Sequence, residues 1–183
     1  MWPWGHAALG YLLYRLCSWQ REWRLSDGPV IALAIGTQFP DLVDKPLAWT
    51  FGVIPSGRSL THSLISAAIV LAIILYITRK RNREPLGIAF AVGYLGHLLG
   101  DALVPLLELD FVFLRFLAWP LYPPPPYESD SSFLAHLQNI EMTSFFMLEL
   151  LIFCIAVVIW IYDGYPGLQK GRQLLSQVFP KTK

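Results

Sequence analysis

A histidine and an aspartate four residues apart inside one long apolar stretch constrain this chain more than any other feature. His97 and Asp101 belong to the run Gly-Tyr-Leu-Gly-His-Leu-Leu-Gly-Asp, within the apolar segment Pro85–Leu107. On a helix this spacing places both side chains on one face, and the segment is long enough to cross a membrane. Ionisable side chains inside such a segment are costly and by default functional. The alternative is a structural pair that only joins two helices.

The composition also indicates a membrane protein. Of the 183 residues, 55% are hydrophobic and 15% are charged, whereas about 25% of the residues in a soluble domain are charged. The net charge of +1 gives no indication of nucleic-acid binding. We therefore expect an all-α integral membrane helical bundle with about four to five membrane-embedded helices. Residues 1–163 would form this bundle, and residues 164–183 a short basic cytoplasmic tail.

Five apolar stretches predict the helices of the bundle. They are Trp4–Trp19, Val30–Phe39, Leu64–Thr78, Pro85–Leu107 and Thr143–Ile161. The second stretch is short and is expected to end at Pro40, because proline breaks helices. The run Ser26-Asp27-Gly28-Pro29 marks its start. Either Thr61 or Ser63 caps the third helix.

The basic residues set the expected orientation in the cell membrane. The segment Arg79–Arg83 carries four positive charges, which favours the cytoplasmic side, and the C-terminal tail falls on the same side. His62 lies 17 residues before Arg79, or roughly 25 Å along a helix. By this reasoning six polar residues from four segments share one level near the non-cytoplasmic face. They are His6, Asp41, Asp44, His62, His97 and Asp101.

Histidine and aspartate side chains gathered at one level predict a metal site. Both are common ligands, and a cation removes the cost of holding several carboxylates together. Zinc is the favoured metal, although manganese, iron and magnesium also accept these ligand types. Such an ion can activate water and polarise a phosphoryl or carbonyl oxygen. The predicted ligands are His6, Asp41, His62, His97 and Asp101.

Three of the predicted site residues have alternative roles. Asp44 is a ligand, a general base in addition to Asp41, or the partner of Lys45. Arg58 clamps a phosphate through two hydrogen bonds or anchors the headgroup region of the membrane. His6 is a ligand or an interfacial side chain next to the N-terminal tryptophans.

Four short motifs give the chain a family resemblance. They are Gly5-His6, Phe39-Pro40-Asp41-Leu42-Val43-Asp44, Arg58-Ser59-Leu60-Thr61-His62-Ser63 and Gly93–Asp101, with Ala118-Trp119-Pro120 as a further match. Together, and in this order, they resemble the membrane-bound metal-dependent hydrolases of bacteria and archaea, which include LexA-regulated inner-membrane proteins. The order of the histidines and aspartates is also similar, more loosely, to that of zinc-dependent phospholipases C. The resemblance implies hydrolysis of an ester or phosphoester bond.

Two departures from these patterns reduce the expected number of metal ions. Gly57 stands where members of the family often have a histidine, and His136 and Glu141 are five residues apart, so they do not share a helix face. One or two ions are therefore expected rather than three. The resulting hypothesis is a hydrolase that acts on a phosphoester of a membrane lipid or lipid-linked molecule. The alternatives are a metal-ion binding or transport protein, and a non-enzymatic scaffold with a structural His/Asp cluster.

Overall fold

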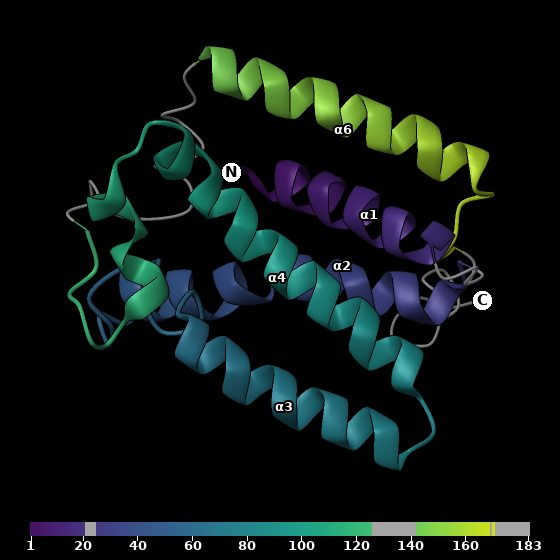
Figure 1. Cartoon of the computed structure of the whole chain (residues 1–183), viewed down its shortest axis with the longest axis horizontal. Helices are drawn as coiled ribbons and strands as arrows, with labels where there is room; N and C mark the ends of the chain where they lie inside the picture. Colours follow the sequence, from purple (N-terminus) through teal and green to yellow (C-terminus); the bar gives the residue numbers. More distant parts are fainter. Residues whose placement is uncertain (21–24, 126–141, 169, 171–183) are drawn as a thin grey trace, which may run out of the picture.

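The computed structural model describes residues 1–20, 25–125, 142–168 and 170, and every regular element in these ranges is helical. Five α-helices form the bundle in Figure 1: α1 (Pro3–Gln20), α2 (Asp27–Lys45), α3 (Leu64–Lys80), α4 (Glu84–Leu107) and α6 (Ser144–Tyr162). A π-helical turn, η1 (Pro46–Thr50), extends α2, and a 3-10 helix, η2 (Phe111–Ala118), follows α4. The predicted all-α class is confirmed for these ranges. The predicted tail beyond Lys170 and the pair His136 and Glu141 lie outside the described residues.

Helix α4 lies at the centre of the bundle and packs against α1, α2 and α3 (Figure 1). Its most extensive contact is with α2, because glycines let the two backbones approach closely. A Cβ atom added to Gly36 would clash with the carbonyl oxygen of Phe90, and one added to Gly93 would clash with that of Leu33. Small residues at helix contacts are typical of membrane bundles. This contact brings the end of α2 beside the histidine and aspartate of α4.

Helix α6 packs on α1 and lies at the edge of the bundle (Figure 1). Polar contacts attach it: Glu149 Oε2 accepts the backbone N–H of Trp2 at 3.0 Å, and Asp163 Oδ2 accepts the Tyr11 hydroxyl at 2.8 Å and pairs with Arg15 Nε at 2.9 Å. In the most apolar 18-residue stretch of this helix, only 11% is buried inside the protein. Among the described residues, α4 and α6 are the two helices that are long and apolar enough to span a membrane. Membrane embedding of the other three helices stays a prediction.

The prediction that the second helix ends at Pro40 is wrong. Helix α2 continues to Lys45, so Asp41 and Asp44 occupy its last turn rather than a following loop. Proline removes one helical hydrogen bond but does not prevent further turns after it. The ion pair between Lys45 Nζ and Asp41 Oδ2, at 2.6 Å and with i,i+4 spacing, stabilises the final turn. Helix α4 likewise continues past Pro105.

Hydrogen bonds decide where α3 begins. The Ser63 hydroxyl oxygen accepts the backbone N–H of Ile65, so Ser63 is the N-cap. The other candidate, Thr61, instead donates its hydroxyl to Asp44 Oδ1 at 2.7 Å. The Ser63 hydroxyl also donates to the carbonyl oxygen of Trp119, just after η2. The segment that carries His62 is therefore held by α2 on one side and by the end of η2 on the other.

Candidate metal centre

The six side chains predicted to share one level converge at one end of the bundle. They are His6 from α1, Asp41 and Asp44 from the last turn of α2, His62 from the loop before α3, and His97 and Asp101 from α4. All six are buried. Buried imidazoles and carboxylates are costly unless they are paired or bind a cation, so their partners decide what the cluster can do.

The two central histidines are oriented through their Nδ1 atoms. His97 Nδ1 lies 2.7 Å from the carbonyl oxygen of Thr37, and His62 Nδ1 lies 2.9 Å from Asp44 Oδ2. Because both partners accept hydrogen bonds, each Nδ1 carries a proton, and each Nε2 is left to bind a proton or a metal. These two Nε2 atoms lie 3.1 Å apart. Imidazole ligands of one metal ion require this kind of convergence.

Asp41 and Asp101 add two oxygen atoms to the pair of nitrogens. Asp41 Oδ1 lies 3.5 Å from His62 Nε2 and 3.8 Å from His97 Nε2, and Asp101 Oδ2 lies 3.5 and 3.7 Å from the same two atoms. Ligands placed about 2.0–2.1 Å from a tetrahedral ion are about 3.3–3.4 Å from one another. The five separations above, from 3.1 to 3.8 Å, are close to this value. Ligand atoms of His62, His97 and Asp101 all lie within 4.8 Å of one another, so these three residues could hold one ion, with Asp41 beside them.

His6 lies beside this set and stacks on His97, with ring centroids 3.7 Å apart. Its Nε2 is 3.3 Å from Asp101 Oδ1. Within the described residues, neither ring nitrogen of His6 nor Asp101 Oδ2 has a hydrogen-bond partner, although all three atoms are buried. An unsatisfied buried polar atom costs about 1–3 kcal/mol, and a bound cation would satisfy Asp101 Oδ2 and one of the two ring nitrogens of His6. With Asp41 and His97, His6 forms a second group whose ligand atoms lie within 4.8 Å of one another.

Asp44 is adjacent to the set, but its carboxylate faces the loop before α3. It accepts the backbone N–H groups of Ser59 and Thr61, at 3.0 and 2.9 Å, and the Thr61 hydroxyl at 2.7 Å. Together with the Nδ1 contact of His62, these bonds occupy its lone pairs. Asp44, one of the two predicted bases, therefore orients the His62 imidazole and holds the loop before α3. Its alternative partner, Lys45, instead forms an ion pair with Asp41.

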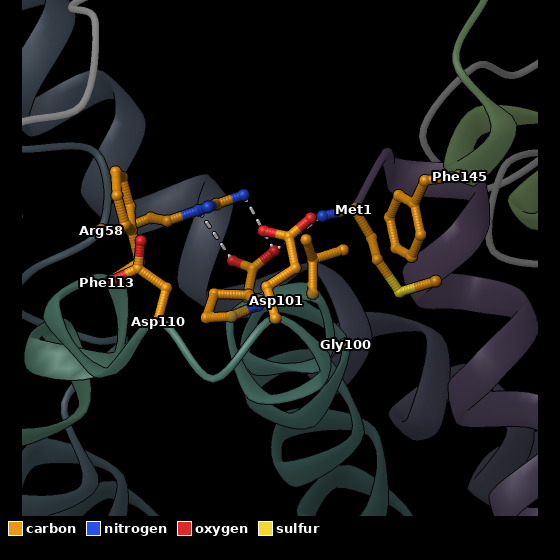
Figure 2. Close-up of a pocket in the computed structure, with 10 residues that line it drawn as sticks. Met1, Arg58, Gly100, Asp101, Asp110, Phe113 and Phe145 are labelled. Carbon is orange, nitrogen blue, oxygen red and sulfur yellow. Dashed lines mark hydrogen bonds and ion pairs between the residues drawn. The ribbon is translucent and has the colours of Figure 1, made fainter.

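Arg58 lies between the buried cluster and a cavity of about 360 Å³. Its Nη2 donates to Asp101 Oδ1 at 3.0 Å, and its Nε forms an ion pair with Asp101 Oδ2 at 3.0 Å without hydrogen-bond geometry (Figure 2). The Met1 amine also donates to Asp101 Oδ1, at 2.8 Å. The Arg58 side chain remains 29% exposed, so it faces the cavity as well as the cluster.

The pKa of His62 follows from the groups around its ring. Burial lowers the pKa of an imidazole, but the neighbouring carboxylates of Asp101, Asp41 and Asp44 outweigh burial and raise the pKa of His62 to about 10. In the metal-free protein the ring therefore holds a second proton at neutral pH. A cation bound at this position would take the place of that proton.

Glu149 is a buried residue near the cluster that sequence reasoning did not single out. Its Oε2 accepts the backbone N–H of Trp2, and it lies 3.0 Å from the position of a Cβ atom added to Gly5. This contact fixes the start of α1, which carries His6. Its sequence context indicates a special role, because Glu149 is the one charged residue in the apolar stretch 143–161.

The fold and the cluster together define an all-helical protein with a buried His/Asp site that could hold a metal ion. The chain belongs to the YdjM inner membrane protein family, whose sequence profile matches residues 1–168. No curated protein and no solved structure matches the chain. The family confirms the predicted membrane class and agrees with the membrane-bound family that the motifs resemble. It shows no likeness to a hydrolase or to phospholipase C.

Proposed function

We propose that this membrane protein is a metal-dependent hydrolase that cleaves a phosphoester in a membrane lipid or lipid-linked substrate. The observation that carries the proposal is the convergence of two Nε2 atoms and two carboxylate oxygens at separations of 3.1–3.8 Å. Zinc is the favoured ion, and manganese, iron or magnesium would use the same ligand types. A divalent ion held by three of these atoms, with water in the fourth position, would lower the pKa of that water and polarise a phosphoryl oxygen.

The surrounding residues divide the remaining tasks in this proposal. Asp44 and the Thr37 carbonyl hold the two imidazoles in position, at 2.9 and 2.7 Å. Arg58 binds a phosphate oxygen with the part of its guanidinium group that faces the cavity. Asp41 is the better candidate for the general base when water, rather than Asp41 Oδ1, completes the coordination of the ion, because Lys45 holds only its Oδ2 atom while the lone pairs of Asp44 are occupied.

We further propose that the site opens toward the non-cytoplasmic face of the cell membrane in a multi-pass protein with a cytoplasmic C-terminus. The basic segment Arg79–Arg83 lies between α3 and α4, whereas Asp101 lies near the other end of α4. The two are separated by roughly 25 Å along the helix axis. Since basic loops favour the cytoplasm, the site lies at the outer level, where a lipid headgroup can reach it.

Metal content and hydrolysis measured on the same preparations test the proposal. Detergent-purified wild-type protein should hold about one or two equivalents of zinc and hydrolyse a phospholipid. His97→Ala and Asp101→Ala should lose both properties. Glu84→Gln, which removes an exposed carboxylate at the opposite end of α4, should keep both. Absence of metal from the wild-type protein after reconstitution with zinc would overturn the proposal.

The transport and scaffold alternatives predict different results for His97→Ala. A transporter would carry zinc into proteoliposomes, and the variant would lose this flux. A scaffold would show neither flux nor hydrolysis in the wild-type protein, and the variant would lose its fold. Thermal unfolding of each variant therefore accompanies the assays, because it separates a lost activity from a lost structure.

A further inference from the structure

The cavity beside Arg58 runs along one face of α4. Asp101, Val104, Pro105 and Glu108 line it, and their spacing of three or four residues places them in one stripe on the helix. Arg58 and the start of η2 face this stripe (Figure 2). A volume of about 360 Å³ falls within the range of small-molecule sites. The cavity is therefore large enough for a ligand and opens directly onto the candidate metal centre.

The inner end of the cavity is suited to an anion. Its charged groups are Arg58, Asp101 and the Met1 amine, and Asp101 Oδ2 is buried without a hydrogen-bond partner among the described residues. When Asp101 serves as a metal ligand, its negative charge is balanced by the ion. Arg58 and the Met1 amine are then the cationic groups at this end of the cavity, and a guanidinium binds phosphate through paired hydrogen bonds.

The outer end of the cavity is suited to a cation. Glu108 is the C-cap of α4, and Asp110 follows two residues later. The C-terminus of a helix carries a partial negative charge, and the last turn of α4 contains no basic residue.

The distance between the two ends limits the size of the ligand. Glu108 follows Asp101 by seven residues, which corresponds to about 10 Å along the helix axis. The two charged ends of the cavity are therefore about two helical turns apart, which suits a compact zwitterion whose phosphate and ammonium groups are joined by a short carbon chain.

We propose that this cavity selects a zwitterionic phospholipid headgroup of the phosphoethanolamine class, with the phosphate at Arg58 and the ammonium group at Glu108 and Asp110. This inference rests on the proposed function, because it places the phosphoester beside the metal centre. It adds the substrate class, and it can be tested by binding alone. An anionic headgroup without an amine would meet two carboxylates at the outer end and bind less tightly.

Phosphorus-31 line broadening of soluble headgroups measures this selectivity in a phosphorus-free detergent. The probes are phosphoethanolamine, glycerol phosphate and inorganic phosphate, added to the zinc-loaded full chain. Wild-type protein should bind phosphoethanolamine roughly tenfold more tightly than glycerol phosphate. The double variant Glu108→Gln with Asp110→Asn should lose this preference and keep its affinity for inorganic phosphate. Asparagine keeps the Oδ1 atom that accepts the N–H of Val112, so η2 retains its cap.

Controls and contrary outcomes separate the inference from the proposed function. Glu84→Gln should leave the preference unchanged. Equal binding of all three probes by the wild-type protein, or an unchanged preference in the double variant, would overturn the inference even if the enzyme hydrolyses lipids. A clear preference without metal or hydrolysis would support the inference and reject the proposed function. Nanodiscs containing phosphatidylethanolamine should suppress binding of the soluble probe more than phosphatidylglycerol nanodiscs, and equal suppression would rule out a lipid ligand.

Discussion

His62 Nε2 and His97 Nε2 lie 3.1 Å apart, although the two residues are separated by 35 positions in the sequence. Each ring is fixed from its other nitrogen, one by the Asp44 carboxylate and one by the Thr37 carbonyl oxygen. Neither acceptor can donate a hydrogen bond in return, so the two Nε2 atoms point inward in every protonation state. The pair could therefore form part of a coordination sphere, and an ion would bind without a prior rotation of either ring.

Replacing Asp44 should weaken metal binding without removing a ligand. Asp44→Asn keeps the shape of the side chain, but its amide can donate to His62 Nδ1 and thereby favour the wrong tautomer. Loss of such an outer partner typically lowers metal affinity 10–100-fold. Competition with a zinc chelator measures this change. Asp27→Asn, at the far end of α2, is the matched control and should bind zinc normally. An unchanged zinc affinity in Asp44→Asn would show that the contact does not orient the ring.

Zinc binding should release a proton over a defined pH range. The pKa of His62 is raised to about 10 in the metal-free protein, so zinc must displace a proton at pH 8. Apparent zinc affinity should rise about tenfold per pH unit up to that pKa. In the metal-free protein, the stabilisation from this raised pKa is complete below the ordinary histidine value of about 6.5 and is lost as the pH rises through 10. Calorimetric titration in two buffers of different ionisation enthalpy counts the proton. Affinity that does not change with pH would contradict the assignment.

The contact between α2 and α4 should tolerate no added methyl group. Gly36→Ala places a Cβ atom against the Phe90 carbonyl oxygen, and a backbone atom cannot move aside as a flexible side chain can. Overpacking typically lowers the free energy of unfolding by about 1–3 kcal/mol. The melting temperature of the detergent-purified protein should therefore fall. Gly28→Ala, where the nearest atom belongs to the Leu86 side chain at 3.1 Å, should change it less. Equal melting temperatures in both variants would show that the two backbones can separate at little cost.

Arg58 should contribute to hydrolysis but not to metal retention. Arg58→Lys keeps the positive charge and loses the planar fork that binds carboxylate and phosphate through two bonds. If Arg58 stabilises charge on the phosphate, kcat/KM should fall about a hundredfold while the zinc content stays at the wild-type level. A loss of zinc in parallel with activity would instead indicate that Arg58 acts by holding Asp101 in place, across the 3.0 Å contact.

The sequence predicts those parts of the site that depend on local spacing. His97 and Asp101 share a helix face because they are four residues apart, and the positive-inside argument brings His62 to the same level. Long-range partners follow no such rule. Asp44 binds the N–H groups of Ser59 and Thr61, which are 15 and 17 residues away, and no periodicity predicts where a loop folds back onto a helix end.

Pro40 and Glu149 show two further limits of sequence reasoning. Pro40 suggested a helix end, but tertiary contacts and the ion pair of the following turn sustain α2 to Lys45. Glu149 stood alone in an apolar stretch, and its partner is the backbone N–H of Trp2, 147 positions away. A backbone donor leaves no signature in the sequence, so a search for a complementary side chain does not find it.

The ligand residues come from α1, the end of α2, the loop before α3 and α4, and this distribution has a consequence for biogenesis. Among the described helices, no two consecutive ones supply all of these residues. A metal ion would therefore gain its full set of ligands only after the last of these segments had docked. Metal occupancy in a membrane extract would then report the fraction of molecules that have completed assembly.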